Sequence, residues 1–226
     1  MLGIVGAMDV EINDLISSVQ DKKEERIGNY TFYIGKIKNK EVVILKSGIG
    51  KVASSLGVGL MIEKFHPEAI VNTGIAGGVA PLASKDIVLT KTLCYGDVDA
   101  TVFGYKLGQV PQMPECFKAD EVLLDRVMNA LEQKNISFKL GNAMTFDSFV
   151  SSIKDKKIPE LKENTICEME GAAIAQACYI LNTPFLGIRY VSDVVDSESQ
   201  IKDYLSFETE MAHLSSKIIK DIISLI

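Results

Sequence analysis

The chain has 226 residues, of which 47% are hydrophobic, and a formal net charge of −6. This size and apolar content predict one substantial core, and the acidic excess argues against binding to a phosphate backbone, because nucleic-acid binders concentrate Lys and Arg. No apolar stretch is long enough to span a bilayer, and the N-terminus lacks the positive region of a signal peptide. We therefore expect a soluble cytoplasmic protein, with no nucleic-acid or membrane partner, that folds as a single domain over residues 1–226.

Short apolar runs alternate with helical periodicity along the chain. In chain order, strands are predicted at Leu2–Met8, Tyr30–Ile37, Glu41–Ser47, Ala69–Thr73, Asp86–Cys94, Phe138–Thr145, Ile166–Met169 and Phe185–Val191. Helices are predicted at Val10–Val19, Val52–Phe65, Glu121–Asn135, Gly171–Leu181 and Phe207–Ile223. The alternation predicts an α/β fold with a central mixed, mostly parallel sheet and helices on both faces. The Asn39-Lys40 turn adds an antiparallel hairpin to that sheet.

The cysteines and histidines do not form a metal-binding pattern. No two cysteines form a C-x-x-C pair. The four cysteines and two histidines of the chain are Cys94, Cys116, Cys167, Cys178, His66 and His213. We expect no metal and no cofactor. In a reducing compartment the four thiols are predicted to be buried or idle, with no disulfide.

Two glycine-rich segments imitate nucleotide-binding motifs without matching them. Residues 47–51 end like a P-loop, but Leu45 stands where the first glycine belongs and Val52 where Ser or Thr is required. Residues 73–78 follow a predicted strand but lack the G-x-G-x-x-G spacing of a dinucleotide site. No G-x-S-x-G elbow of a serine hydrolase is present either. These glycines indicate either close approach of the backbone to a ligand or a tight turn, and the pattern leaves both open.

Two carboxylates follow predicted buried strands at opposite ends of the chain. Glu11 comes directly after the first strand, and Asp193 ends the apolar run from Phe185. An acid and a base at the carboxyl ends of two strands can protonate a leaving group and activate water in one crevice. This placement favours a metal-free hydrolase. The structural alternatives are a surface Glu at a helix start and an Asp that caps a helix.

Six ordered blocks carry a resemblance to a known family. They are Gly6-Ala7-Met8-x-x-Glu11, Lys46-Ser47-Gly48-Ile49-Gly50-Lys51-Val52, Asn72-Thr73-Gly74-x-Ala76-Gly77-Gly78, Phe103-Gly104-Tyr105-x-x-Gly108-Gln109-x-Pro111, Glu168-Met169-Glu170 and Arg189-x-x-Ser192-Asp193. With these blocks together, the chain resembles the 5′-methylthioadenosine/S-adenosylhomocysteine nucleosidases of the purine nucleoside phosphorylase superfamily. The resemblance runs nearly from Met1 to Ile226. Each block alone would be a weak signal, whereas six in order are specific.

The resemblance implies a reaction and roles for its polar residues. The family hydrolyses the bond between adenine and ribose, in methionine salvage and the recycling of S-adenosylmethionine by-products. By position in the blocks, Asp193 would protonate adenine at N7, with Ser192 orienting it. Glu11 would take the proton of the attacking water, as the base of an inverting glycosidase does. Glu170 would accept hydrogen bonds from the ribose hydroxyls, and Arg189 would help to place the water and Glu170.

The same resemblance assigns the apolar lining and a partner. Phe149 and Val150 would recognise adenine by stacking and by backbone contacts. The residues expected near the sugar and its thio substituent, or closing over the nucleoside, are Met8, Ile49, Ile75, Gly77, Met169 and Phe207. Three further residues would reach into a neighbouring subunit's site, which implies a homodimer: Phe103, Tyr105 and Pro111.

The sequence departs from the family pattern at two places. Ile75 stands where the family usually has Ser, so a hydroxyl near the ribose is lost. The segment Val194–Leu205 is longer than expected between the acid and the last helix, and a longer lid would affect substrate entry or preference. The alternatives that remain are an aminodeoxyfutalosine nucleosidase, a nucleoside phosphorylase and a catalytically silent nucleoside-binding relative. The phosphorylase is disfavoured because Asp9 and Glu11 would repel phosphate.

Overall fold

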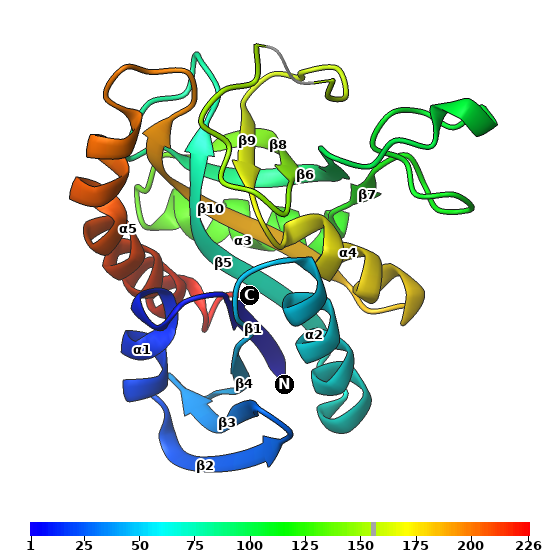
Figure 1. The fold of residues 1–226 in the computed structure, drawn as a ribbon. Helices are drawn as coiled ribbons and strands as arrows, with labels where there is room; N and C mark the ends of the chain where they lie inside the picture. Colours follow the sequence, from blue (N-terminus) through cyan, green and yellow to red (C-terminus); the bar gives the residue numbers. More distant parts are fainter. Residues whose placement is uncertain (155–156) are drawn as a thin grey trace.

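The computed structural model describes residues 1–154 and 157–226, and the two termini lie near each other beside the first strand (Figure 1). The strands are β1 (Leu2–Gly6), β2 (Gln20–Ile27), β3 (Tyr30–Ile37), β4 (Lys40–Lys46), β5 (Ala69–Gly78), β6 (Ile87–Tyr95), β7 (Phe117–Lys118), β8 (Lys139–Thr145), β9 (Thr165–Glu168) and β10 (Phe185–Val194). The helices are α1 (Asp9–Ser17), α2 (Lys51–Phe65), α3 (Glu121–Gln133), α4 (Gly171–Ile180) and α5 (Gln200–Ile222), with a short 3₁₀ helix η1 (Thr101–Phe103).

All these strands join one mixed sheet. Its order is β10-β6-β8-β9-β5-β1-β4-β3-β2, with β7 paired to β6. Strand β10 also pairs with β5, so β5, β10, β6, β8 and β9 close on themselves like a small barrel, and the remaining strands extend from it. Parallel pairs join β1 to β4 and β5, β5 to β10, and β8 to β6 and β9. The other pairs are antiparallel, including the edge hairpins.

The sequence predicted this α/β architecture, and the mixed sheet with helices on both faces is confirmed. The hairpin between β3 and β4 is present, and Lys38 and Asn39 take φ values of 47° and 68°, as a type I′ turn requires. Strand β2 was not predicted, because the six residues between Gln20 and Ile27 in its sequence QDKKEERI are all charged and the strand is mostly exposed. It forms by adding to the edge of β3, a tertiary effect that period-2 hydrophobicity cannot reveal.

Two apolar layers hold the helices against the two faces of the sheet. One layer contains buried residues of α1, α3 and α5, and the other contains buried residues of α2 and α4. Figure 1 shows α1 and α5 side by side on one face and α2 and α4 on the other, and each pair is in contact. Within residues 1–154 and 157–226, no helix combines the length and the apolar character needed to cross a membrane.

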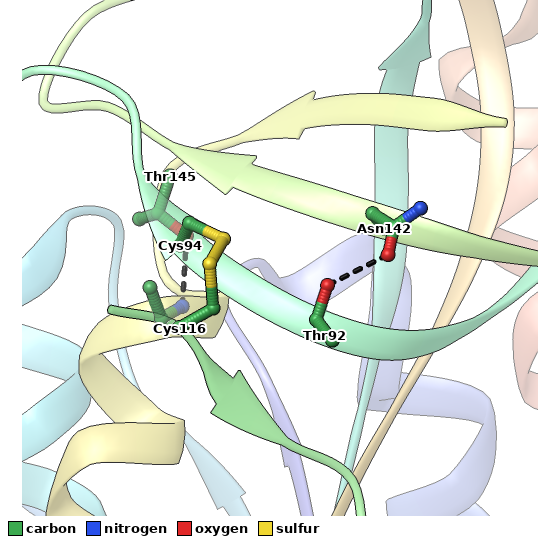
Figure 2. Close-up of a disulfide and its surroundings, with 6 residues drawn as sticks. Thr92, Cys94, Cys116, Asn142 and Thr145 are labelled. Atoms are coloured by element: carbon green, nitrogen blue, oxygen red, sulfur yellow. Dashed lines mark hydrogen bonds between the residues drawn. A yellow bond between two sulfur atoms is a disulfide. The ribbon is translucent and has the colours of Figure 1, made fainter. Parts of the chain in front are cut away.

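A disulfide joins Cys94 to Cys116 (Figure 2), so the prediction that all four cysteines stay reduced is wrong. The antiparallel register of β6 and β7 pairs Leu93 with Phe117, which places the two cysteines opposite each other with Cα atoms 4.5 Å apart. This distance suits a disulfide. A separation of 22 residues in the sequence gave no sign of this proximity.

The chain between the two disulfide cysteines forms an arm that projects from the body (Figure 1). It carries η1, where Val102 is 84% exposed and Phe103 78% exposed. Exposed apolar side chains on a projecting segment are the kind of surface that partners cover. The disulfide closes the base of this arm against the sheet.

Candidate active site

A cavity of about 110 Å³ lies where several strands end and the helices that follow them begin. Its lining combines acidic side chains with apolar and backbone surfaces. The lining residues are Ala7, Met8, Glu11, Ile49, Ile75, Ala76, Gly77, Ser148, Phe149, Val150, Cys167, Glu168, Met169, Glu170, Ser192, Asp193 and Tyr204. Glu11 and Asp193 are 182 positions apart in the sequence. The structure brings both to one cavity, as an acid–base pair requires.

Glu11 lies in the first turn of α1 and is held by backbone groups of two segments. One carboxylate oxygen, Oε2, accepts N–H bonds from Ala7 at 2.7 Å and Met8 at 3.0 Å. The other, Oε1, accepts the N–H of Ile75 at 3.0 Å. A Cβ on Gly74 would lie 2.5 Å from Oε1, so only glycine leaves room for this carboxylate. The short loop after β1 and the end of β5 therefore fix its position.

The environment of Glu11 raises the pKa of its carboxyl. Burial is the largest cause, because the side chain is in a low-dielectric setting that disfavours its charged form. The three backbone hydrogen bonds and the positive charge of Arg189 oppose this effect. A buried carboxylate with a raised pKa is a suitable proton acceptor near neutral pH.

Asp193 lies near the end of β10, and its carboxylate contacts two side chains. Ser192 Oγ donates to Oδ1 at 2.6 Å, as the prediction that Ser192 orients Asp193 requires, and Gln200 Nε2 donates to Oδ2 at 2.8 Å. A Cβ on Gly77 would lie 3.1 Å from Oδ2, a tight contact that a small shift of the carboxylate relieves. Asp193 is 1% exposed.

Glu170 lies at the start of α4 and lines the cavity. Its Oε1 accepts the backbone N–H of Gly50 at 2.9 Å, and Gly50 has a φ of 94°, a conformation that favours glycine. Burial, followed by the charges of Glu168 and Glu11, raises the pKa of Glu170 to about 7. The carboxyl is thus readily protonated and deprotonated near neutral pH.

Arg189 lies behind the cavity wall and supports the acidic residues from there. Its Nη1 donates to the Asn72 carbonyl at 3.0 Å and its Nη2 to Glu168 Oε2 at 2.9 Å, with a further contact between Nη2 and Asn72 Oδ1. Glu168 also accepts the N–H groups of Glu170 at 3.0 Å and Gly171 at 2.6 Å. The guanidinium therefore reaches Glu170 through Glu168, and it acts on Glu11 and Glu170 through its charge.

The predicted apolar residues lie in the cavity with one exception. Met8, Ile49, Ile75, Phe149, Val150 and Met169 all line it. Phe207, expected to close over the nucleoside, is outside the lining, where it packs against the apolar layer of α1, α3 and α5, with Lys85 Nζ 5.1 Å from its ring centroid. Tyr204 lines the cavity instead, edge-on to Phe149 with ring centroids 5.4 Å apart.

The reason for this difference is the start of α5. The sequence predicted this helix from Phe207, whereas it begins at Gln200, so most of the segment Val194–Leu205 is β10 or the first turns of α5. The additional turns bring Tyr204 and Gln200 to the site. Most residues from 200 to 206 are polar or exposed, so the sequence shows no helical periodicity there. No motif identified Gln200 or Tyr204 as a site residue.

Phe103, Tyr105 and Pro111, predicted to serve a neighbouring subunit, all lie within the projecting arm between Cys94 and Cys116. None of them lines the cavity of its own chain. Phe103 and Pro111 are exposed and Tyr105 is half-buried. These positions leave the three side chains available to a second molecule.

The chain is similar to known nucleosidases over its whole length. The family model of the phosphorylase superfamily matches residues 1–224. A 5′-methylthioadenosine/S-adenosylhomocysteine nucleosidase of Staphylococcus haemolyticus is 40% identical, with 100% of both chains covered. The solved structure of the corresponding Neisseria meningitidis enzyme with methylthio-immucillin-A is 34% identical, with a TM-score of 0.91 and coverage of 100% and 99%.

A futalosine hydrolase mutant of Helicobacter pylori is a more distant structural relative. It is 27% identical, with a TM-score of 0.90, and the match covers 100% of this chain and 99% of that one. The same architecture thus serves more than one nucleoside.

Proposed function

Because the chain belongs to the 5′-methylthioadenosine/S-adenosylhomocysteine nucleosidase family of the phosphorylase superfamily, we propose that it hydrolyses the N-glycosidic bond of these two nucleosides. The products are adenine and a 5-thioribose sugar. The observation that carries the proposal is the meeting of Glu11 and Asp193 in one cavity, each buried and hydrogen-bonded. The protein is an N-glycosyl hydrolase that uses water as the nucleophile.

Asp193 is the general acid of the proposed reaction. Adenine leaves poorly as an anion, so a proton must reach N7 while the bond between C1′ and N9 breaks. Phe149 stacks on the base, and the backbone of Val150 contacts its edge. Ser192 holds the acid through the hydrogen bond to Oδ1. General acid–base catalysis of this kind contributes typically about 10²–10⁴-fold.

Glu11 is the general base. A water molecule attacks C1′ from the face opposite adenine, its oxygen bonds to the carbon, and its proton passes to Glu11. The raised pKa of Glu11 supports this role, because a base that is too weak would not accept the proton. Glu170 accepts hydrogen bonds from the ribose hydroxyls, and Met8, Ile49, Ile75 and Met169 contact the sugar or its thio substituent.

A second copy of the chain completes the site in this proposal. Phe103, Tyr105 and Pro111 of one subunit reach the thio substituent in the other, so the protein is a homodimer. The exposed arm supports this assignment, since Phe103 is 78% exposed and outside its own cavity. A single domain over residues 1–226 and a cytoplasmic location stay predictions from the sequence.

The direct test is adenine release from 5′-methylthioadenosine, S-adenosylhomocysteine and aminodeoxyfutalosine, each with and without phosphate. We expect the first two to be cleaved at rates that do not depend on phosphate. The third is included because of the likeness to the futalosine hydrolase. A requirement for phosphate, with a sugar 1-phosphate as product, would show that the protein is a phosphorylase.

A further inference from the structure

Gln200, in the first turn of α5, joins two parts of the site. Its Nε2 donates to the carbonyl of Val150 at 2.9 Å and to Oδ2 of Asp193 at 2.8 Å. Both neighbouring atoms accept hydrogen bonds, so the amide must present its nitrogen to them, and both of its N–H groups are used. Gln200 is 3% exposed and does not line the cavity, which means that it acts on the site through these two partners.

We propose that Gln200 is a positioning residue that holds the general acid in place relative to the adenine-recognition loop, residues 149–152. This inference rests on the proposed function, in which Asp193 protonates the base and Val150 contacts its edge. Because one nitrogen bonds to both residues, the amide sets the carboxylate and the recognition loop in a fixed mutual arrangement. Adenine seated against Val150 then meets an acid that is already in position.

The same contact affects which oxygen of Asp193 carries the transferable proton. An amide nitrogen only donates, so a proton on Oδ2 would face the N–H of Gln200. A proton on Oδ1 faces the Ser192 hydroxyl, which can accept it while turning its own hydrogen to the Ala76 carbonyl 3.3 Å away. The Gln200 contact therefore disfavours a proton on Oδ2 relative to one on Oδ1.

Neighbouring contacts make the start of α5 a firm support for this amide. Tyr204, one turn after Gln200, packs its ring against Phe149 of the recognition loop. Before the helix, Asp196 accepts the Ser152 hydroxyl at 2.5 Å. The segment from Asp193 to Tyr204 is thus attached to residues 149–152 at several points. The hydrogen bond from Gln200 to the Val150 carbonyl is buried.

The test compares three variants in steady-state kinetics with 5′-methylthioadenosine, with active sites counted by calorimetric titration with adenine. Gln200→Met keeps the length and removes the donor, whereas Gln200→Glu keeps the shape and sets a second carboxyl beside Asp193. Ile201→Ala is the control, since its side chain is 64% exposed on the same turn. Counting active sites separates lost positioning from lost folded protein.

For Gln200→Met we expect kcat per active site to fall by about tenfold or more, with KM within about threefold, because the acid is misplaced only for the chemical step. Gln200→Glu should lose more, and Ile201→Ala should stay within about twofold of the parent. If kcat per active site of both Gln200 variants stays within about twofold, or if the loss lies in KM alone, the proposal is wrong. The rate of the unaltered protein in the same assay reports separately on the proposed function.

Discussion

Glu11 and Asp193 are buried to a similar extent, at 3% and 1% exposure, but different kinds of atoms hold them. Glu11 accepts three backbone N–H groups, from Ala7, Met8 and Ile75. Asp193 accepts two side-chain donors, from Ser192 and Gln200. Backbone donors are retained under any side-chain substitution except proline, whereas side-chain donors can be lost one at a time. The proposed base is therefore fixed by the fold, and the proposed acid by the identity of two residues.

The largest effect is expected when either carboxylate is neutralised. Glu11→Gln removes the proton acceptor and Asp193→Asn removes the proton donor, so each should lower kcat by at least about a hundredfold, the usual scale of general acid–base catalysis. Steady-state rates of adenine release measure this. Turnover close to that of the parent in either variant would remove the residue from its proposed role.

The next effect concerns the space beside each carboxylate. A methyl group at Gly74 would lie 2.5 Å from Glu11 Oε1, while one at Gly77 would lie 3.1 Å from Asp193 Oδ2. Because Glu11 is held by backbone groups, it cannot yield without losing them, and we expect Gly74→Ala to lower kcat by about tenfold or more, within the 1–3 kcal/mol typical of overpacking. Gly77→Ala requires a smaller shift and should cost about threefold or less. Equal losses in the two variants would contradict the difference between the two carboxylates.

A pH effect on stability follows from Glu170. Its pKa is raised from 4.5 to about 7 by burial and by the charges of Glu168 and Glu11. The folded state thus binds this proton more tightly than the unfolded state, so the free energy of unfolding should decrease as pH rises through that window. The raised pKa of Glu11 acts in the same direction.

Thermal unfolding of the ligand-free protein between pH 4.5 and 8 measures this dependence. Glu170→Gln should flatten it, because the amide can still accept the Gly50 N–H but does not titrate. An unchanged slope in Glu170→Gln would show that other groups produce the dependence.

The smallest effect is expected at Ile75, where the family usually has Ser. The group that holds Glu11 is the backbone N–H of Ile75, which Ile75→Ser retains. We expect catalytic efficiency to change only a few-fold, or about 1 kcal/mol, the net contribution of one hydrogen bond. The ratio between methylthioadenosine and S-adenosylhomocysteine should change more, since the side chain lines the cavity. Kinetics on both substrates decide this, and an equal change above roughly a hundredfold would show that Ile75 governs the chemical step.

The sequence predicted the parts of the molecule that local patterns encode. Buried strands have near-continuous apolar runs, and the glycine-rich turns and carboxylates follow them directly, so the meeting of Glu11 and Asp193 at one cavity could be expected. The predicted strand Ala69–Thr73 nevertheless continues to Gly78 as β5, because its later residues pair with β10 and β9. Such an extension depends on neighbours rather than on composition.

The features that the sequence did not reveal depend on contacts between distant segments. The charged strand β2 exists because the edge of β3 is available, and the Cys94–Cys116 disulfide exists because β7 pairs with β6. Gln200 and Tyr204 reach the site because α5 begins earlier than its apolar pattern indicates. In each case the residue types are compatible with an exposed loop, and only the tertiary structure gives them a partner.

The most direct test of the central claim is the configuration of the sugar at the moment of its release. If Glu11 activates water on the face opposite the adenine that Asp193 protonates, the reaction inverts the anomeric carbon. Proton NMR, recorded at high enzyme concentration before the anomers equilibrate, should then show the α-anomer of 5-methylthioribose formed first from the β-nucleoside. Initial formation of the β-anomer would contradict the account, since it would require a covalent intermediate or attack from the same face as the leaving base.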